Sequence, residues 1–361
     1  MNIDKKEAFA LLINDIHVSK NNIPEFNANW EEALSVCHKY GIERIIIGGD
    51  LWQSRSSQTL STILAVKDAL TKATDDGITV VIAEGNHDKV NQESVFGYGH
   101  IFSEYPDIFA VQDYAIFRMK RASDITDLYV MSYFPENGSF VERYLKMCEA
   151  LNPSHKSVLY IHQGIKGGIS TASDDELPAS LFENFDCVLV GHYHDRNIVK
   201  GTNIEYIGAS RQHNFGEDEE KGYTIIYTDG SYEFVKNQVN NRYKTINTSF
   251  NDIVPALFDN IRGVLRDNRY RIRIKVYCLS AQVSLIDKQK FIDCGVSKVE
   301  IVTEKSILSS SAFEQTLSEK YDKNGIKQEY VNFCSDKEID NVDLGLSYLD
   351  KITNSDYVAT K

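Results

Sequence analysis

The chain has 361 residues, of which 42% are hydrophobic and 11% aromatic, which is typical of a globular protein with one large and one small domain. Its formal net charge of -13 argues against binding nucleic acid through a general basic surface, because neutralising phosphates requires clustered lysines and arginines. The six cysteines include no C-x-x-C pair, so neither a zinc knuckle nor a disulfide framework is expected. The chain shows no signal-peptide pattern and no run long enough to cross a membrane, so a cytoplasmic location is expected.

Buried strands alternate with amphipathic helices in the first part of the chain. Strands are predicted at Ala8–Ile13, Arg44–Ile47 and Ile78–Ile82, and helices at Asn29–Tyr40 and Thr59–Ala73. This alternation is typical of a parallel sheet covered by helices. In open sheets of this kind, ligands bind at the carboxyl ends of the strands.

The middle of the chain is richer in strands. Strands are predicted at 114–119, 128–132, 157–161, 187–190, 197–200, 205–207, 223–227 and 232–236, with a helix at 139–150. The later strands are short and separated by glycine-containing turns, which indicates antiparallel pairing. The predicted fold class is mixed α/β, a two-layer β-sandwich flanked by helices.

The pattern restarts near Asn247 as helix, strand, helix and strand, at 252–266, 270–278, 285–295 and 298–303. We therefore expect a main domain over 1–240 and a small α-β-α-β domain over 247–306. A C-terminal region over 307–361 contains two predicted helical segments, 311–321 and 337–352.

Polar side chains follow five of the predicted strands. They are Asp15 and His17, Asp50, Asn86 and His87, His162, and His192 and His194. Gly85 is expected to let the backbone turn sharply before Asn86. Such packed polar groups are costly unless a charged ligand lies in front of them.

The mixed oxygen and nitrogen ligands suit Mn²⁺, and also Fe or Zn. Seven ligands exceed the need of one tetrahedral ion, but they suit two divalent ions about 3.5–4 Å apart. Two such ions activate a hydroxide at neutral pH and neutralise a phosphate in the same step. The constellation therefore predicts hydrolysis of a phosphoester.

The motifs D-x-H, G-G-D, G-N-H-D, a lone H and G-H-x-H, in this order, resemble the calcineurin-like metallophosphoesterase superfamily over about the first two thirds of the chain. The resemblance implies that Asp15, His17 and His194 hold one metal, that Asn86, His162 and His192 hold the other, and that Asp50 bridges them. It also implies that His87 is not a ligand, and that it assists the leaving oxygen or holds the scissile phosphate.

The chain departs from this pattern at two places. Nucleases of the superfamily often have a carboxylate three positions after the bridging aspartate, where this chain has Gln53, and a glycine soon after D-x-H, where it has Val18 and Ser19. We expect these departures to change substrate fit or metal affinity without abolishing the site.

Three features favour a nuclease. The segments Tyr206–Ser210, Phe215–Glu217 and Lys221–Tyr223 resemble the SbcD family and the small subunits of phage recombination endonucleases. The small α-β-α-β domain resembles the capping domain of SbcD-type nucleases. In the strand at 270–278, basic residues alternate with apolar ones, so one face could follow a phosphate backbone; the basic residues are Arg269, Arg271, Arg273 and Lys275.

The leading hypothesis is a Mn²⁺-dependent DNA exo/endonuclease subunit of SbcD type, acting in DNA-end processing, repair or recombination. An SbcC-like coiled-coil ATPase would dock on the C-terminal helical segments, and a homodimer is an open alternative to a monomer. A second hypothesis is a free-standing phosphodiesterase or phosphatase for a small phosphoester, and a third is a non-catalytic scaffold for the ATPase. The remaining histidines, including His213, are interpreted as packing or exposed residues, and Glu217–Glu220 as a solvated turn.

Overall fold

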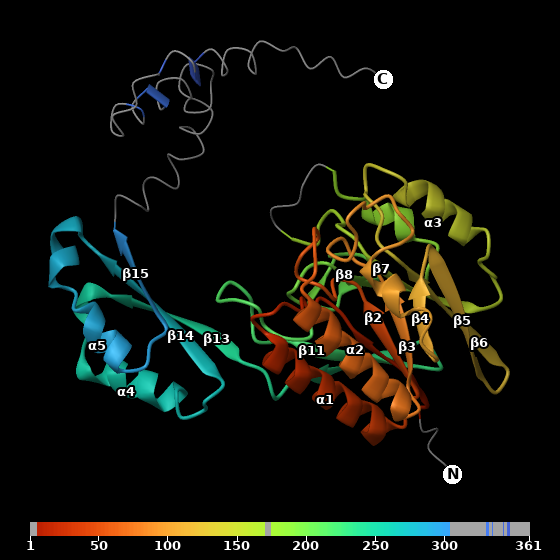
Figure 1. Cartoon of the computed structure of the whole chain (residues 1–361), viewed down its shortest axis with the longest axis horizontal. Helices are drawn as coiled ribbons and strands as arrows, with labels where there is room; N and C mark the ends of the chain where they lie inside the picture. The colour runs from red at the N-terminus through yellow and green to blue at the C-terminus, as the bar shows by residue number, and fades with distance from the viewer. Residues whose placement is uncertain are drawn as a thin grey trace. The chain divides into compact units, whose positions relative to one another are not determined.

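The computed structural model describes residues 6–169 and 175–303, together with residues 330, 331, 334, 342, 345 and 346. The chain forms two compact units (Figure 1). The first comprises residues 1–244 and 265–271, and the second comprises residues 245–264 and 272–361. No helix among the described residues is long and apolar enough to span a membrane.

The first sheet of the larger unit has the strand order β12-β11-β1-β2-β3-β4. Its strands are β1 (Ala8–Ile13), β2 (Arg44–Gly48), β3 (Thr79–Ala83), β4 (Ile108–Val111), β11 (Gly222–Tyr227) and β12 (Tyr232–Lys236). Strands β1 to β4 are parallel, whereas β11 pairs antiparallel with β1. The predicted parallel core is confirmed, and the short edge strand β4 is an addition that the sequence reading missed.

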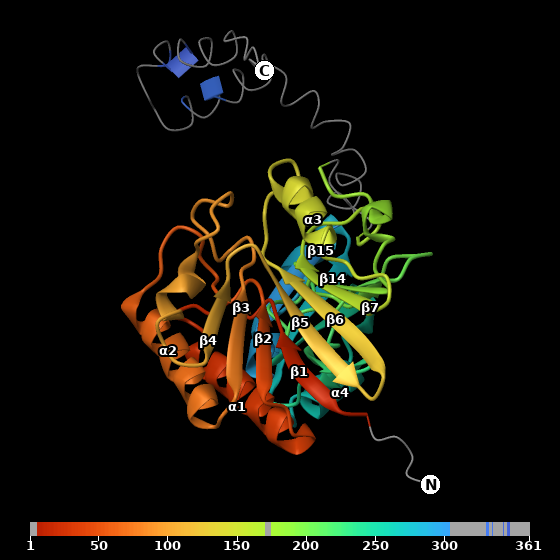
Figure 2. The same cartoon turned by 90° about the vertical axis from the view of Figure 1, so that its right-hand side faces the viewer.

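Two helices cover the outer face of this sheet, α1 (Ile23–Tyr40) and α2 (Leu60–Asp75) (Figure 2). Helix α1 begins six residues before its predicted start, because Pro24 is compatible with the first helical turn. It ends at Gly41, whose φ of 68° allows the left-handed cap. Helix α2 begins after Thr59, whose hydroxyl accepts the backbone N–H of Thr62.

The second sheet has the order β5-β6-β7-β8-β10-β9. Its strands are β5 (Tyr114–Arg121), β6 (Asp124–Met131), β7 (Lys156–His162), β8 (Cys187–Gly191), β9 (Asn197–Ile198) and β10 (Ile204–Tyr206). Helix α3 (Phe140–Cys148) packs on its outer face. Apolar side chains of both sheets, among them Leu12, Ile46, Leu128 and Leu189, form the core between them. The predicted β-sandwich flanked by helices is confirmed.

The smaller unit contains a three-stranded sheet of order β13-β14-β15, made by β13 (Arg242–Ser249), β14 (Tyr270–Cys278) and β15 (Lys298–Thr303). Helices α4 (Pro255–Val264) and α5 (Lys288–Asp293) accompany it. Both predicted strands have the expected bounds, and both helices are shorter than expected. Strand β13 was missed, because its mostly polar sequence lacks an apolar run.

The predicted segments 311–321 and 337–352 lie almost wholly outside the described residues, and the capping role of the smaller unit stays a prediction. All six cysteines are free thiols, as expected.

Candidate metal centre

The carboxyl ends of β1, β2, β3, β7 and β8 meet at one edge of the sandwich, and they bring together all seven predicted ligands. Asp50 lies at the centre of this cluster. Its carboxylate oxygens are 3.4 Å from Nε2 of His162 and 3.6 Å from Nε2 of His17. Nε2 of His194 lies 3.8 Å from Asp15 Oδ1 and 3.1 Å from Nε2 of His17.

The second group of predicted ligands reaches the same carboxylate. Oδ1 of Asn86 lies 3.3 Å from Nδ1 of His192 and 3.2 Å and 3.3 Å from the two oxygens of Asp50. The Asn86 oxygen thus faces acceptors, an arrangement that is unfavourable alone and favourable around a cation. Asp15 Oδ1 is also buried without a hydrogen-bond partner. These observations, with the oxygen and imidazole donor set, fit divalent metal ions.

The backbone at the ligands is held in a sparsely populated conformation. Asp15, His17, Asp50 and His192 have positive φ angles of 50°, 51°, 51° and 88°. Backbone hydrogen bonds hold the first two loops together, from Asp15 N to Gly49 O and from His17 N to Asp50 O. Left-handed backbone at bulky non-glycine residues is costly and concentrates at functional sites, where the surroundings enforce it.

Gly85 is required for space rather than for a turn. Its φ is not positive, in contrast to the predicted sharp turn. A Cβ at this position would lie 2.3 Å from Asp50 Oδ1 and 2.4 Å from Asp50 N. The absence of a side chain at Gly85 therefore lets the loop after β3 approach the central carboxylate.

The electrostatics favour ligand chemistry at neutral pH. Burial lowers the pKa of His17 to about 4 and that of His192 to about 3, so both rings are neutral. Burial also opposes protonation of His162, but Asp50 and Asp15 outweigh it and raise its pKa to about 10. The pKa of Asp50 lies well below its usual range because His162 outweighs the effect of burial. A cation entering the cluster must therefore displace the proton on His162.

His87 lies beside the cluster with one ring nitrogen committed to the protein. Its backbone N–H donates to Asp50 Oδ1 at 2.8 Å, and its Nδ1 donates to the Gln53 carbonyl oxygen at 2.8 Å. Its Nε2 has no hydrogen bond among those described. The departure at Gln53 thus supplies a main-chain contact to His87. His87 is also near enough to His17 and Asp50 to form a metal-holding group by distance alone.

Two contacts of this site were missed or misinterpreted from the sequence. The Glu217 side chain is only 8% exposed, and its carboxylate lies 2.9 Å from Nδ1 of His194, so the solvated-turn interpretation of Glu217 was wrong. His213 packs against His17 and His194 with ring centroids at 5.1 Å and 4.7 Å, and its Nε2 donates to the carbonyl oxygen of Asp15. The only sequence signal was position, since both follow β10 and return toward β1 in space.

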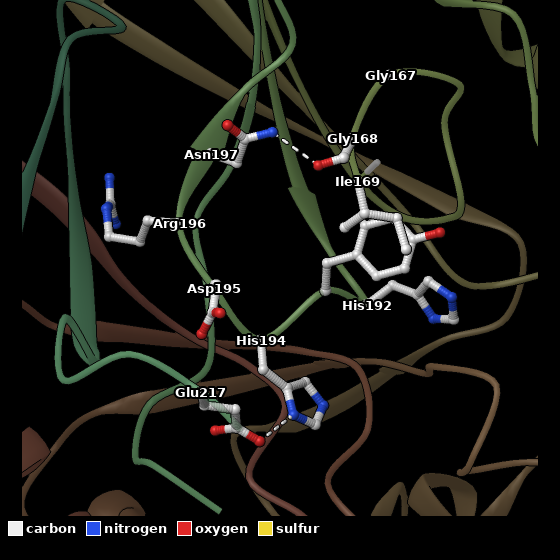
Figure 3. Close-up of a pocket in the computed structure, with 10 residues that line it drawn as sticks. Gly167, Gly168, Ile169, His192, His194, Asp195, Arg196, Asn197 and Glu217 are labelled. Atoms are coloured by element: carbon white, nitrogen blue, oxygen red, sulfur yellow. Dashed lines mark hydrogen bonds and ion pairs between the residues drawn. The ribbon is translucent and has the colours of Figure 1, made fainter. Parts of the chain in front are cut away.

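A cavity of about 890 Å³ lies beside the cluster (Figure 3). His192 and His194 form one side of it, and Glu217 lies next to His194. Gly168, Ile169 and Asn197 line the other side.

Comparisons with known proteins agree with this arrangement. Residues 10–196, more than half of the chain, match the family model described as Calcineurin-like phosphoesterase. A relative named "Putative phosphoesterase 244L", from Invertebrate iridescent virus 6, is 25% identical over 280 residues, which cover 74% of this chain and 92% of the relative.

Solved structures with detectable likeness have low sequence identity. The protein TT1561 of Thermus thermophilus is 14% identical, with a TM-score of 0.41, covering 64% of this chain and 99% of that protein. The nuclease MPE of Pseudomonas putida is 15% identical, with a TM-score of 0.26, covering 61% and 84%. A dimetal phosphatase from Danio rerio is 11% identical, with a TM-score of 0.39, covering 62% and 93%.

Proposed function

Because the chain belongs to the calcineurin-like phosphoesterase family and is a metal-dependent phosphoester hydrolase, we propose that it is a DNA nuclease subunit of SbcD type. The observation that carries the chemical part of this proposal is the convergence of seven ligand side chains around Asp50, next to an imidazole with a free nitrogen. The observation that favours DNA is the basic face of β14.

The residues divide into two metal positions. Asp15, His17 and His194 would hold the first ion, and Asn86, His162 and His192 the second. Asp50, which contacts both groups, would be shared between them. When bound, the two divalent ions, Mn²⁺ by this proposal, supply an activated water nucleophile and neutralise phosphate charge.

His87 acts as the general acid in this proposal. The Gln53 carbonyl oxygen can only accept a hydrogen bond, so Nδ1 of His87 carries a proton. The free Nε2 of the protonated ring then gives its proton to the leaving oxygen of the phosphoester. The hydrogen bond from the His87 backbone to Asp50 holds this imidazole beside the metal positions.

The smaller unit provides the feature that supports a DNA substrate. Ile272, Ile274 and Val276 of β14 are buried, whereas the alternate residues Arg273 and Lys275 lie on the opposite, partly exposed face. Lys298 of β15 lies beside them in the parallel register. Arg273, Lys275 and Lys298 share a single carboxylate, that of Glu300, so the face keeps excess positive charge. Such a face attracts phosphates despite the acidic chain.

The partners and the setting belong to the same proposal. An SbcC-like coiled-coil ATPase would bind the region over 307–361, the nuclease subunits could pair as a homodimer, and the complex would act in the cytoplasm on DNA ends. A second candidate function, hydrolysis of a small phosphoester, is favoured by the cavity beside His192 and His194.

Cleavage assays distinguish the two. End-labelled linear duplex and single-stranded DNA are incubated with the full chain and Mn²⁺, with a small bis-aryl phosphodiester alongside. Mn²⁺-dependent degradation of DNA, abolished by a chelator, is the expected result. Cleavage of the small ester with DNA left intact would favour the second function, and loss of neither substrate would contradict both for the isolated chain.

A further inference from the structure

The imidazoles proposed as ligands differ in what holds the ring nitrogen that faces away from the cluster. Nδ1 of His162 lies 3.0 Å from the Gly48 carbonyl oxygen. Nδ1 of His17 is buried without a hydrogen-bond partner. Nδ1 of His194 instead lies 2.9 Å from Oε1 of Glu217. Of these three rings, His194 is the one whose outer nitrogen faces a carboxylate.

The carboxylate of Glu217 is itself held in place. Its Oε2 accepts the backbone N–H of His213 at 2.9 Å, and its Oε1 accepts the side-chain amide of Asn214 at 2.7 Å. The Glu217 carbonyl oxygen accepts the side-chain amide of Gln212 at 2.8 Å. Figure 3 shows the resulting contact, with the Glu217 carboxylate pointing at the outer edge of the His194 ring. The orientation of this carboxylate is therefore set by the loop around it and not by solvent.

The contact determines which nitrogen of His194 is free. A carboxylate accepts the Nδ1–H, so the lone pair lies on Nε2. Nε2 is the atom that lies 3.8 Å from Asp15 Oδ1 and 3.1 Å from Nε2 of His17. The ring therefore presents a ligand atom to the group that forms the first metal position.

We propose that Glu217 is a positioning residue for the first metal position, and that it acts through His194. This inference rests on the proposed role of Asp15, His17 and His194 as ligands. A carboxylate behind a ligating imidazole fixes the ring and increases its basicity, and losing such a partner typically weakens metal binding by about 10–100-fold. The second position contains no ligand that contacts Glu217 among the described hydrogen bonds and ion pairs. The two positions therefore differ in their dependence on this residue.

Calorimetric titration of the metal-free full chain with Mn²⁺ tests the proposal. The native chain is expected to bind two ions. Glu217→Ala is expected to weaken one of the two affinities by about 10–100-fold and to leave the other unchanged. Glu217→Gln keeps the shape and a hydrogen-bond acceptor for Nδ1, and we expect it to restore part of the loss.

Glu220→Gln is the matched control. Glu220 lies on the same loop, is exposed and pairs with Lys236, so its substitution removes one negative charge without touching His194. Both Mn²⁺ affinities should remain native. A second readout is the electron paramagnetic resonance signal of the paired Mn²⁺ ions, which should be lost in Glu217→Ala at metal concentrations that fill only the stronger position.

The outcomes separate this inference from the proposed function. A native chain that binds fewer than two ions would contradict the metal centre itself. Two ions in the native chain and unchanged affinities in Glu217→Ala and Glu217→Gln would overturn the role of Glu217 alone. Thermal unfolding of the metal-free variants checks folding, and if Glu217→Ala is unfolded, the isosteric Glu217→Gln decides by its weakened or native affinity.

Discussion

Among single residues, His87 differs from the imidazoles proposed as ligands because its Nδ1 is bound to the main chain and its Nε2 is free of hydrogen bonds among those described. The proposed ligands direct a nitrogen toward Asp50, Asp15 or Asn86 instead. A ring held in this way can transfer a proton without contributing to metal affinity.

His87→Ala should therefore reduce phosphodiester cleavage by about 10²–10⁴-fold, the usual contribution of a general acid, and leave both Mn²⁺ affinities unchanged. Steady-state hydrolysis of the bis-aryl phosphodiester and a Mn²⁺ titration of the same preparation measure the two quantities. Native activity in the variant would refute the proton-transfer role, and loss of one ion would show that His87 is a ligand.

His213 provides a pH dependence of stability. Burial, aided by Arg211, lowers its pKa well below the usual imidazole value. In the unfolded chain its pKa returns to about 6.5, so below that pH the unfolded state binds the extra proton and stability falls. With metal removed by a chelator, the unfolding temperature of the native chain should drop more steeply from about pH 6.5 to about pH 4.5 than that of His213→Gln. Equal slopes would contradict this prediction.

At the scale of elements, the site depends on how closely the loops after β2 and β3 approach each other. Gly85 leaves room for Asp50, and a methyl group there would overlap the carboxylate and its own main-chain nitrogen. This contact between two loops involves backbone atoms, so a side-chain rotation cannot relieve it.

Gly85→Ala should therefore weaken Mn²⁺ binding by at least about tenfold and reduce cleavage accordingly, through displacement of Asp50. Gly263→Ala is the control, because a Cβ there meets nothing within 4 Å and alanine favours the α4 helix. Metal titration of the two variants provides the comparison. Native metal affinity in Gly85→Ala would show that the loops can separate without loss of the site.

The basic face of the smaller unit yields a second prediction at this scale. Lys275→Ala combined with Lys298→Ala should weaken duplex binding and reduce the salt dependence of its affinity by about 0.9 per lost phosphate contact. Hydrolysis of the small ester should not change. Lys288→Ala with Lys290→Ala removes the same charge from the exposed face of α5 and serves as the control. Equal DNA affinities for both pairs would exclude this face as a DNA contact.

On the scale of the whole molecule, the sequence predicted the sheet core and the site better than it predicted the edges. Strands with β-branched runs, such as β2 and β3, have a strong signal, and polar residues directly after them marked the ligands. Strand β13 and the start of α1 lacked that signal. Glu217 and His213 could not be found from local pattern, because their contacts with His194 and Asp15 arise only when distant segments fold together.

Metal stoichiometry of the chain tests the central claim most directly, because that claim is a single carboxylate shared by two metal positions. Native protein and Asp50→Ala are equilibrated with Mn²⁺, freed of excess metal and assayed for bound ions by elemental analysis. The account predicts two ions per native chain and loss of both in Asp50→Ala. A variant that retains one ion at native affinity would contradict the shared role of Asp50.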